Sequence, residues 1–224
     1  MRRPARDWLA AHGLLFPLVA ANRRFLRRVV RRGTAVCIEG FPRSANSYAF
    51  LAFRRWNPGV RVGHHLHSPV QVKRAVSLGV PCAVLIRPPL DVVASVLVMD
   101  RGRISDTAAY RSYLQFYTRA LPFRERVVVA PFAEVTRDPA AMVERINASF
   151  GTSFAAEPMT AAASRELMTR MERTQTERGR AVTSLTVPSD EKERGKAELR
   201  ERLATHPLLP EAERLYAEWV GGRS

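Results

Sequence analysis

Lysine and cysteine are scarce in this chain. Its 36 basic residues include only three lysines, Lys73, Lys192 and Lys196, so arginine carries almost all of the positive charge. The two cysteines, Cys37 and Cys82, both fall in apolar runs typical of strands, which favours buried, reduced thiols. The sequence therefore shows no disulfide framework, and we expect a cytoplasmic protein.

Long hydrophobic runs are also missing. The apolar stretch 8–21 is interrupted by Gly13 and Pro17. It falls short of the roughly 20 apolar residues that a membrane-spanning helix needs, and the interruptions argue against a cleaved signal. An organellar transit peptide would be rich in serine, whereas the first serine of the chain is Ser44.

Positive charge is concentrated near the N-terminus. The formal net charge is +15, and residues 1–32 hold nine arginines and one acid. On a helical wheel, Phe25, Leu26, Val29 and Val30 share one face and arginines fill the other, which predicts a basic amphipathic segment. Such a segment either attaches residues 8–32 peripherally to an anionic membrane surface or packs on the domain as its first helix. Nucleic acid is not an expected partner, because aromatic residues make up only 8% and no recognition module is visible.

Strand-like and helical stretches alternate along the rest of the chain. Strands are predicted at 35–39, 60–62, 82–86 and 126–130, and helices at 47–55, 69–78, 91–99, 107–121, 140–150 and 211–220. This alternation predicts an α/β domain over 33–224, with a parallel sheet flanked by helices on both faces, similar to P-loop NTPases. Residues 164–198 are charged and show little apolar periodicity, so we expect a lid or a disordered loop there.

The segment VCIEGFPRSANS at 36–47 is the most informative one. An apolar strand followed by Gly-x-Pro-Arg-Ser and a helix is typical of backbone N–H groups arranged around a phosphate. Its first glycine and last serine keep the register of the Walker A pattern, but Ala45 and Asn46 stand where that pattern has glycine and lysine. The basic residue is Arg43, inside the turn. The loop therefore predicts a phosphate-like ligand that is not bound as a magnesium–nucleotide complex in the usual way.

A second candidate anion site follows the strand at 82–86. Arg87 comes directly after this strand, and Ser95 lies eight positions later on the next helix. In open α/β sheets, ligands bind at the carboxyl ends of the strands, and an arginine with a hydroxyl can hold one phosphate from two sides. The alternative is that Arg87 pairs with Asp91 and that Ser95 has no binding role.

Together the two motifs resemble the sulfotransferases that use 3'-phosphoadenosine 5'-phosphosulfate. That family has a loop of the form G-[FY]-P-[RK]-S-G-[TN]-[TS], and the resemblance covers roughly residues 34–151, including 130–139 before a helix. It implies that the 5'-phosphosulfate is bound by Gly40, Phe41, Pro42, Arg43, Ser44, Ala45, Asn46 and Ser47. It implies that the 3'-phosphate is bound by Arg87 and Ser95, with a late basic residue, Arg178 or Arg180, over it.

Sulfuryl transfer to an alcohol also needs a base and an electropositive group. Arg43 and the loop amides would stabilise charge on the leaving phosphate, and no metal is required. The family places its catalytic histidine in an H-x-P segment after a strand, which His67 matches, so His67 is the first candidate and His65 the second. His64 completes the trio, but a metal site there lacks a nearby carboxylate or cysteine.

The resemblance implies transfer of a sulfuryl group to the hydroxyl of an acceptor such as a glycan or a lipid-linked sugar. One alternative is a P-loop kinase or NTPase, since residues 96–100 imitate a Walker B strand. Another is a non-catalytic nucleotide-binding protein on the same scaffold. The sequence does not identify the acceptor.

Overall fold

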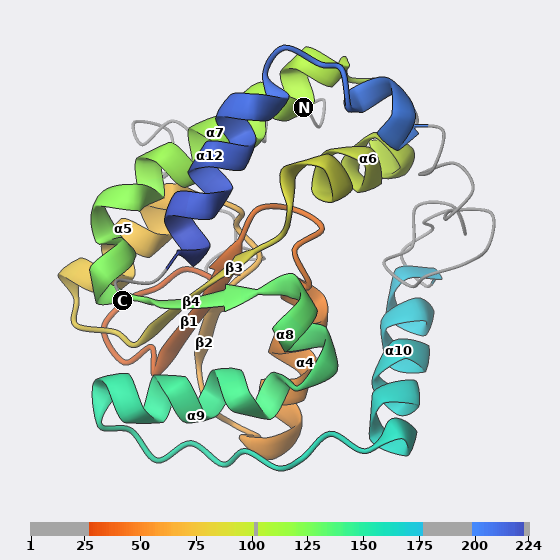
Figure 1. Cartoon of the computed structure of the whole chain (residues 1–224). Helices are drawn as coiled ribbons and strands as arrows, with labels where there is room; N and C mark the ends of the chain where they lie inside the picture. The colour runs from red at the N-terminus through yellow and green to blue at the C-terminus, as the bar shows by residue number, and fades with distance from the viewer. Residues whose placement is uncertain (1–26, 101–102, 177–198, 222–224) are drawn as a thin grey trace.

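The computed structural model describes residues 27–100, 103–176 and 199–221, and its centre is a parallel sheet (Figure 1). The strands are β1 (Val36–Gly40), β2 (Val62–His64), β3 (Cys82–Ile86) and β4 (Val128–Pro131), in the spatial order β2-β1-β3-β4. All three neighbouring pairs are parallel. The predicted α/β fold with a parallel sheet is therefore confirmed.

Helices cover both faces of the sheet (Figure 1). One face carries α5 (Pro69–Ser77), α6 (Pro89–Asp100), α7 (Asp106–Ala120) and α12 (Leu209–Val220). The other carries α4 (Asn46–Trp56), α8 (Phe132–Arg137), α9 (Pro139–Phe150) and α10 (Ala161–Thr176). Within β1, Cys37 belongs to the first core, whereas Val36 and Ile38 belong to the second. Alternate strand residues thus point into two separate cores, which explains why the buried strands read as continuous apolar runs.

The register of the two central strands positions the candidate site. Cys37 pairs with Cys82, and Gly40 at the end of β1 pairs with Leu85 near the end of β3. Both thiols are buried and unbridged, as expected. Because the two strands end almost level, the loop after β1 lies beside the segment that begins at Arg87. The chain leaves β1 toward one face and β3 toward the other, and such a switch point is where open α/β sheets bind ligands.

The segment 164–198 differs from the prediction. Its first part, to residue 176, belongs to α10, whose Leu167 and Met171 are buried four positions apart. The helix is held to α4 by a hydrogen bond between the hydroxyls of Tyr48 and Ser164 (3.1 Å) and by an ion pair between Arg55 and Glu166 (2.7 Å). Charged residues interrupt the apolar periodicity in this stretch, so the sequence did not predict the helix. Residues 177–198 lie outside the described part.

The basic N-terminal segment is described only from residue 27 onward. Residues 27–32 form turns and irregular backbone, not the expected helix, and Val29 and Val30 are buried. The backbone N–H of Val30 donates to the side-chain oxygen of Gln71 in α5 (3.0 Å). The packed domain therefore begins before residue 33. In the described ranges, no helix has the combination of length and apolar character that crossing a bilayer requires.

Candidate functional site

The loop between β1 and α4 is braced from within. A side chain at Gly40 would bring a Cβ within 2.5 Å of the Leu85 carbonyl oxygen, so the close approach of β3 requires glycine here. The Asn46 side-chain amide donates to the Phe41 carbonyl oxygen (2.8 Å), and Asn46 is buried. Phe41 itself packs into the core, edge-on to the ring of Tyr113 (5.6 Å between centroids). The residue at the Walker lysine position is thus a structural brace.

The N-terminus of α4 is open to an anion. Its N-cap residue is Ala45, which makes no capping hydrogen bond, and no acidic residue lies in the first turn. The first N–H groups of a helix lack partners within the helix and attract negative charge. Ser47 follows in this first turn, and Arg43 precedes it in the loop. The local sequence therefore surrounds one point with donors and a guanidinium group.

The two anion-binding motifs are in direct contact. The Arg43 Nε donates to the Ser95 hydroxyl in α6 (3.0 Å), and the Arg87 Nη1 donates to the Arg43 carbonyl oxygen (3.3 Å). The Arg87 guanidinium also lies over the Phe132 ring, 4.0 Å from its centroid. Asp91, the partner expected for Arg87 in the alternative reading, forms an ion pair with Arg200 (2.7 Å) in the described part of the chain. Arg87 is thereby aimed at the β1 loop.

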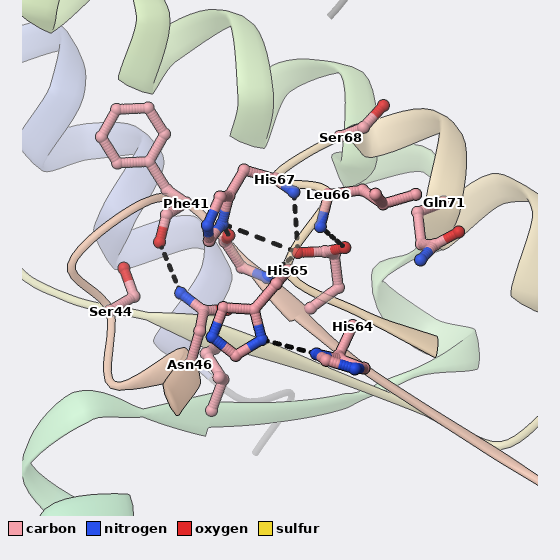
Figure 2. A network of polar contacts seen from close by, with 12 residues as sticks. Phe41, Ser44, Asn46, His64, His65, Leu66, His67, Ser68 and Gln71 are labelled. Carbon is pink, nitrogen blue, oxygen red and sulfur yellow. Dashed lines mark hydrogen bonds and ion pairs between the residues drawn. The ribbon is translucent and has the colours of Figure 1, made fainter. Parts of the chain in front are cut away.

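A histidine-rich loop after β2 lies against the same site (Figure 2). His64 ends the strand and stacks on Phe50, with 3.8 Å between ring centroids. Burial, together with the nearby Arg28 charge, lowers the pKa of His64 to about 3, so this ring stays neutral. His65 bridges from the His64 Nδ1 (2.7 Å) to the Ser47 hydroxyl (2.9 Å). Both ring nitrogens of His65 are thus occupied by neighbours.

His67, the first candidate for the base, belongs to the loop after β2 and contacts the start of the β1 loop. Its Nδ1 is 2.8 Å from the Gly40 carbonyl oxygen and 3.8 Å from a carboxylate oxygen of Glu39. Its side chain is 31% exposed, so the ring reaches solvent although its Nδ1 edge is held. A carbonyl oxygen only accepts hydrogen bonds, so Nδ1 carries the proton of the neutral ring. Nε2 is then the basic atom of His67.

Backbone strain is concentrated in these two loops. Among the described residues, the non-glycine positions with positive φ are Arg43 (71°), Ala45 (67°), His65 (54°) and His67 (51°). The left-handed region costs an L-residue roughly 1–2 kcal/mol. Strained residues persist where the surroundings determine the conformation, and they cluster at functional sites. The strain is an independent indication that the two loops work together.

Glu39 is the site residue that the sequence reasoning missed. Its carboxylate is fully buried, and it accepts backbone N–H groups from Gly40 (3.2 Å), Leu66 (3.1 Å) and His67 (3.0 Å). Burial raises the pKa of Glu39 to about 7, although the three N–H donors and Arg28 act in the opposite direction. The signal was present as one acid in an otherwise apolar strand, VCIEG.

Other predicted site residues have different positions. Ser44 is fully buried, with its hydroxyl 3.5 Å from that of Tyr117, so it supports the loop from below. Pro42 is half-buried in the loop. Arg178 and Arg180 lie outside the described residues. Within the described ranges, no group of three or more His, Cys, Asp or Glu side chains is placed to hold a metal ion.

Comparisons with known proteins gave a likeness to solved structures. No protein-family model matches the chain, and no curated protein sequence does either. Among solved structures, the chain is similar to mouse sulfotransferase SULT7A1 complexed with PAP, at 12% sequence identity and a TM-score of 0.43. That likeness covers 86% of this chain and 91% of the mouse chain.

Proposed function

We propose that this protein is a sulfotransferase that moves the sulfuryl group of 3'-phosphoadenosine 5'-phosphosulfate to an acceptor hydroxyl. The observation that carries the proposal is the contact between Arg43 and Ser95. It joins the β1 loop to the Arg87–Ser95 motif, so two anion-binding groups serve a single site. A nucleotide that carries charged groups on both the 3' and the 5' positions of one ribose fits such a pair.

The donor set suits this ligand. The uncapped start of α4 and the Ser47 hydroxyl would receive the 5'-phosphosulfate, and Arg87 with Ser95 would receive the 3'-phosphate. Arg43 joins the two groups through its hydrogen bond to Ser95 and its carbonyl contact with Arg87. Between residues 27 and 90 the only acid is Glu39, whose carboxylate is engaged with the β2 loop. No exposed carboxylate in this part of the chain therefore opposes a multiply charged anion.

The roles of the residues follow from their positions. When bound, the phosphosulfate would supply the sulfuryl group and its phosphate leaving group. Arg43 and the amides at the start of α4 would stabilise the negative charge that grows on the leaving oxygen. Arg87 and Ser95 would hold the remote phosphate and so orient the nucleotide. His67 Nε2 would take the proton of the acceptor hydroxyl.

The kinase or NTPase alternative is weaker for structural reasons. Asn46, at the Walker lysine position, is a buried brace with its amide on the Phe41 carbonyl. The Walker B-like run 96–100 lies in α6, not at the end of a strand. The non-catalytic alternative, a nucleotide-binding protein on this scaffold, keeps the two anion motifs and differs only in turnover.

Calorimetry with 3'-phosphoadenosine 5'-phosphate tests the binding half of the proposal. We expect 1:1 binding without magnesium, weakened in Arg87→Ala and unchanged in Arg111→Ala, which removes an exposed arginine of α7. Circular dichroism of each variant controls for folding. A folded wild-type protein that does not bind the nucleotide would end the proposal.

Transfer is tested separately with a radiolabelled sulfate donor. Hydroxyl-bearing glycans and lipid-linked sugars are the acceptor classes we propose, and vesicles containing anionic lipid test the proposed attachment through residues 8–32. Labelled product that depends on His67 supports the enzyme. Nucleotide binding without product from any glycan or lipid extract would favour the non-catalytic alternative.

A further inference from the structure

Glu39 is an ionisable group in the interior of the sheet. It occupies the fourth position of β1, between Ile38 and Gly40, and no part of it is exposed to solvent. Removing a carboxylate from water costs several kcal/mol unless its oxygens are well satisfied. The three backbone N–H donors compensate this cost only in part, since the pKa of Glu39 remains raised to about 7. A group this costly calls for an explanation beyond packing.

The contacts of Glu39 converge on the histidine loop. One oxygen accepts the backbone N–H of Leu66, and the other accepts that of His67. Because His67 has a φ of +51°, its backbone is in a conformation that an unsupported histidine rarely adopts. The carboxylate therefore supports the backbone of the loop at the residue whose side chain is the candidate base.

The same carboxylate also faces the His67 ring. Its Oε1 lies 3.8 Å from Nδ1, and the carbonyl oxygen of the next residue, Gly40, accepts the Nδ1 proton at 2.8 Å. Both neighbours of Nδ1 are acceptors, which fixes the tautomer with its lone pair on Nε2. When Nε2 gains a proton, the resulting imidazolium lies next to a carboxylate in a region of low dielectric.

His65 is held differently. Its two ring nitrogens lie against His64 Nδ1 and the Ser47 hydroxyl, and Glu39 makes no hydrogen bond to its backbone among those the structure shows. The neighbouring His64 is neutral and supplies no negative charge. The carboxylate thus distinguishes one histidine of the trio from the other two.

We propose that Glu39 is a positioning residue for His67: it supports the strained loop backbone, fixes the Nδ1–H tautomer together with the Gly40 carbonyl, and stabilises the imidazolium formed in the reaction. This inference rests on the proposed function. In that step the acceptor O–H bond breaks as an N–H bond forms on Nε2, and the acceptor oxygen bonds to sulfur. The bond from sulfur to the phosphate oxygen breaks, and its electron pair stays on the phosphate.

The charged and titratable surroundings of Glu39 bear on any pH dependence. His67 faces it from the β2 loop, and Arg28 acts on it from the segment before β1. Cys37 in β1 and Tyr117 in α7 also sense its charge. The hydrogen bond with Cys82 and burial raise the pKa of Cys37, and burial raises that of Tyr117, so both groups stay neutral near pH 7. Glu39, with a pKa of about 7, is itself a group whose charge changes near neutral pH, and the His67 ring faces it at 3.8 Å.

Nitrogen NMR of the whole protein, labelled with ¹⁵N-histidine, reads the tautomer and titration of His67 without any sulfuryl transfer. The His67 signals are assigned with His67→Ala. We expect the Nδ1–H tautomer in the wild type. In Glu39→Gln we expect a mixture of tautomers and a pKa of His67 lower by about one unit, because an opposite charge at this distance favours the protonated ring. Glu125→Gln, which removes an exposed carboxylate beside Arg124, should change neither.

Kinetics then connect the NMR result to the reaction. Glu39→Gln should lower kcat about 10–100-fold and move the acid limb of the pH profile down by about one unit, with nucleotide affinity unchanged. Glu39→Asp, which keeps the charge, should recover part of the rate and serves if the amide variant does not fold. A wild-type Nε2–H tautomer, or an unchanged His67 titration in Glu39→Gln, would overturn the inference. An intact NMR coupling in a protein that binds no nucleotide would overturn the proposed function alone.

Discussion

The loop after β1 and the loop after β2 have different roles in our proposal, although both use the same backbone conformation. Each follows a parallel strand, and each places two non-glycine residues two positions apart at positive φ: Arg43 and Ala45 in one, His65 and His67 in the other. The first loop ends at a helix N-terminus without a side-chain cap, where we propose that N–H groups and a guanidinium bind an anion. The second gives its N–H groups to a buried carboxylate and presents an imidazole.

The two loops, one proposed to bind the nucleotide and the other to carry the base, differ in what supports them. The β1 loop has a local brace, because the hydrogen bond from Asn46 to Phe41 spans only five positions, and tertiary contacts such as Arg43 to Ser95 are added to it. The β2 loop is built from tertiary contacts, since its anchor, Glu39, lies 28 positions before His67. We therefore expect substitutions in the two loops to affect nucleotide affinity, kcat and stability in different proportions.

The largest effect is expected for His67→Ala. Loss of a positioned base lowers rates by about 10²–10⁴-fold, and we expect this fall in kcat with unchanged affinity for 3'-phosphoadenosine 5'-phosphate. His65→Ala should cost much less, because the ring of His65 bridges His64 and Ser47. Initial rates and calorimetry measure both. Equal losses in the two variants would remove the distinction between the histidines.

Arg43→Ala should lower kcat nearly as much as His67→Ala. Removing a group that stabilises charge in the transition state costs about 10²–10³ in kcat. The thermal midpoint of unfolding should change little. Arg43 is only half-buried, and its loss removes a hydrogen bond to the Ser95 hydroxyl and no core side chain. Steady-state kinetics beside a thermal melt separate the two readouts. A large drop in the melting temperature with normal turnover of the folded fraction would assign Arg43 to the fold.

Stability should depend on pH through Glu39. Its pKa is about 7 in the folded protein against 4.5 as the ordinary value, so the folded state binds the proton more tightly. The stability that Glu39 contributes is therefore fully present below about pH 4.5, and it is lost as pH rises through 7, by up to about 3 kcal/mol. Urea titrations of wild type and Glu39→Gln at several pH values measure the difference. A flat difference would show that Glu39 ionises in the fold as it does in the unfolded chain.

Arg87→Ala should weaken the affinity for the nucleotide and leave kcat almost unchanged. Its guanidinium belongs to the remote phosphate in our proposal, and one charge-assisted contact is worth about 1.5–3 kcal/mol, or about 10–100-fold in Kd. Calorimetry gives the Kd, and kcat is taken at saturating donor. A fall in kcat as large as that of Arg43→Ala would mean that the two arginines share one task.

The smallest effect is expected for Ala45→Gly. Glycine accepts the φ of +67° at this N-cap without strain, but it gains more freedom in the unfolded chain, so the free energy of unfolding should rise by only about 0.5 kcal/mol. Denaturant midpoints measure this change. A loss of stability in Ala45→Gly would show that the alanine methyl makes a contact worth more than the strain.

Local sequence by itself determined the alternation of strands and helices, the parallel sheet and the β1 loop. These features depend on residues close together in the chain: apolar runs of strand length, and a glycine, an arginine and a serine at short spacings. The same reasoning failed for α10, because its two buried residues, Leu167 and Met171, are outnumbered by charges.

Only the tertiary structure decided which groups meet. The level ends of β1 and β3 bring Arg43 to Ser95, 52 positions away, and the packing of the β2 loop brings His67 over Glu39. Sequence spacing carries no information on such contacts, because they depend on strand order and register. A carboxylate one position before a glycine reads as an ordinary strand residue until the fold places an imidazole 3.8 Å away.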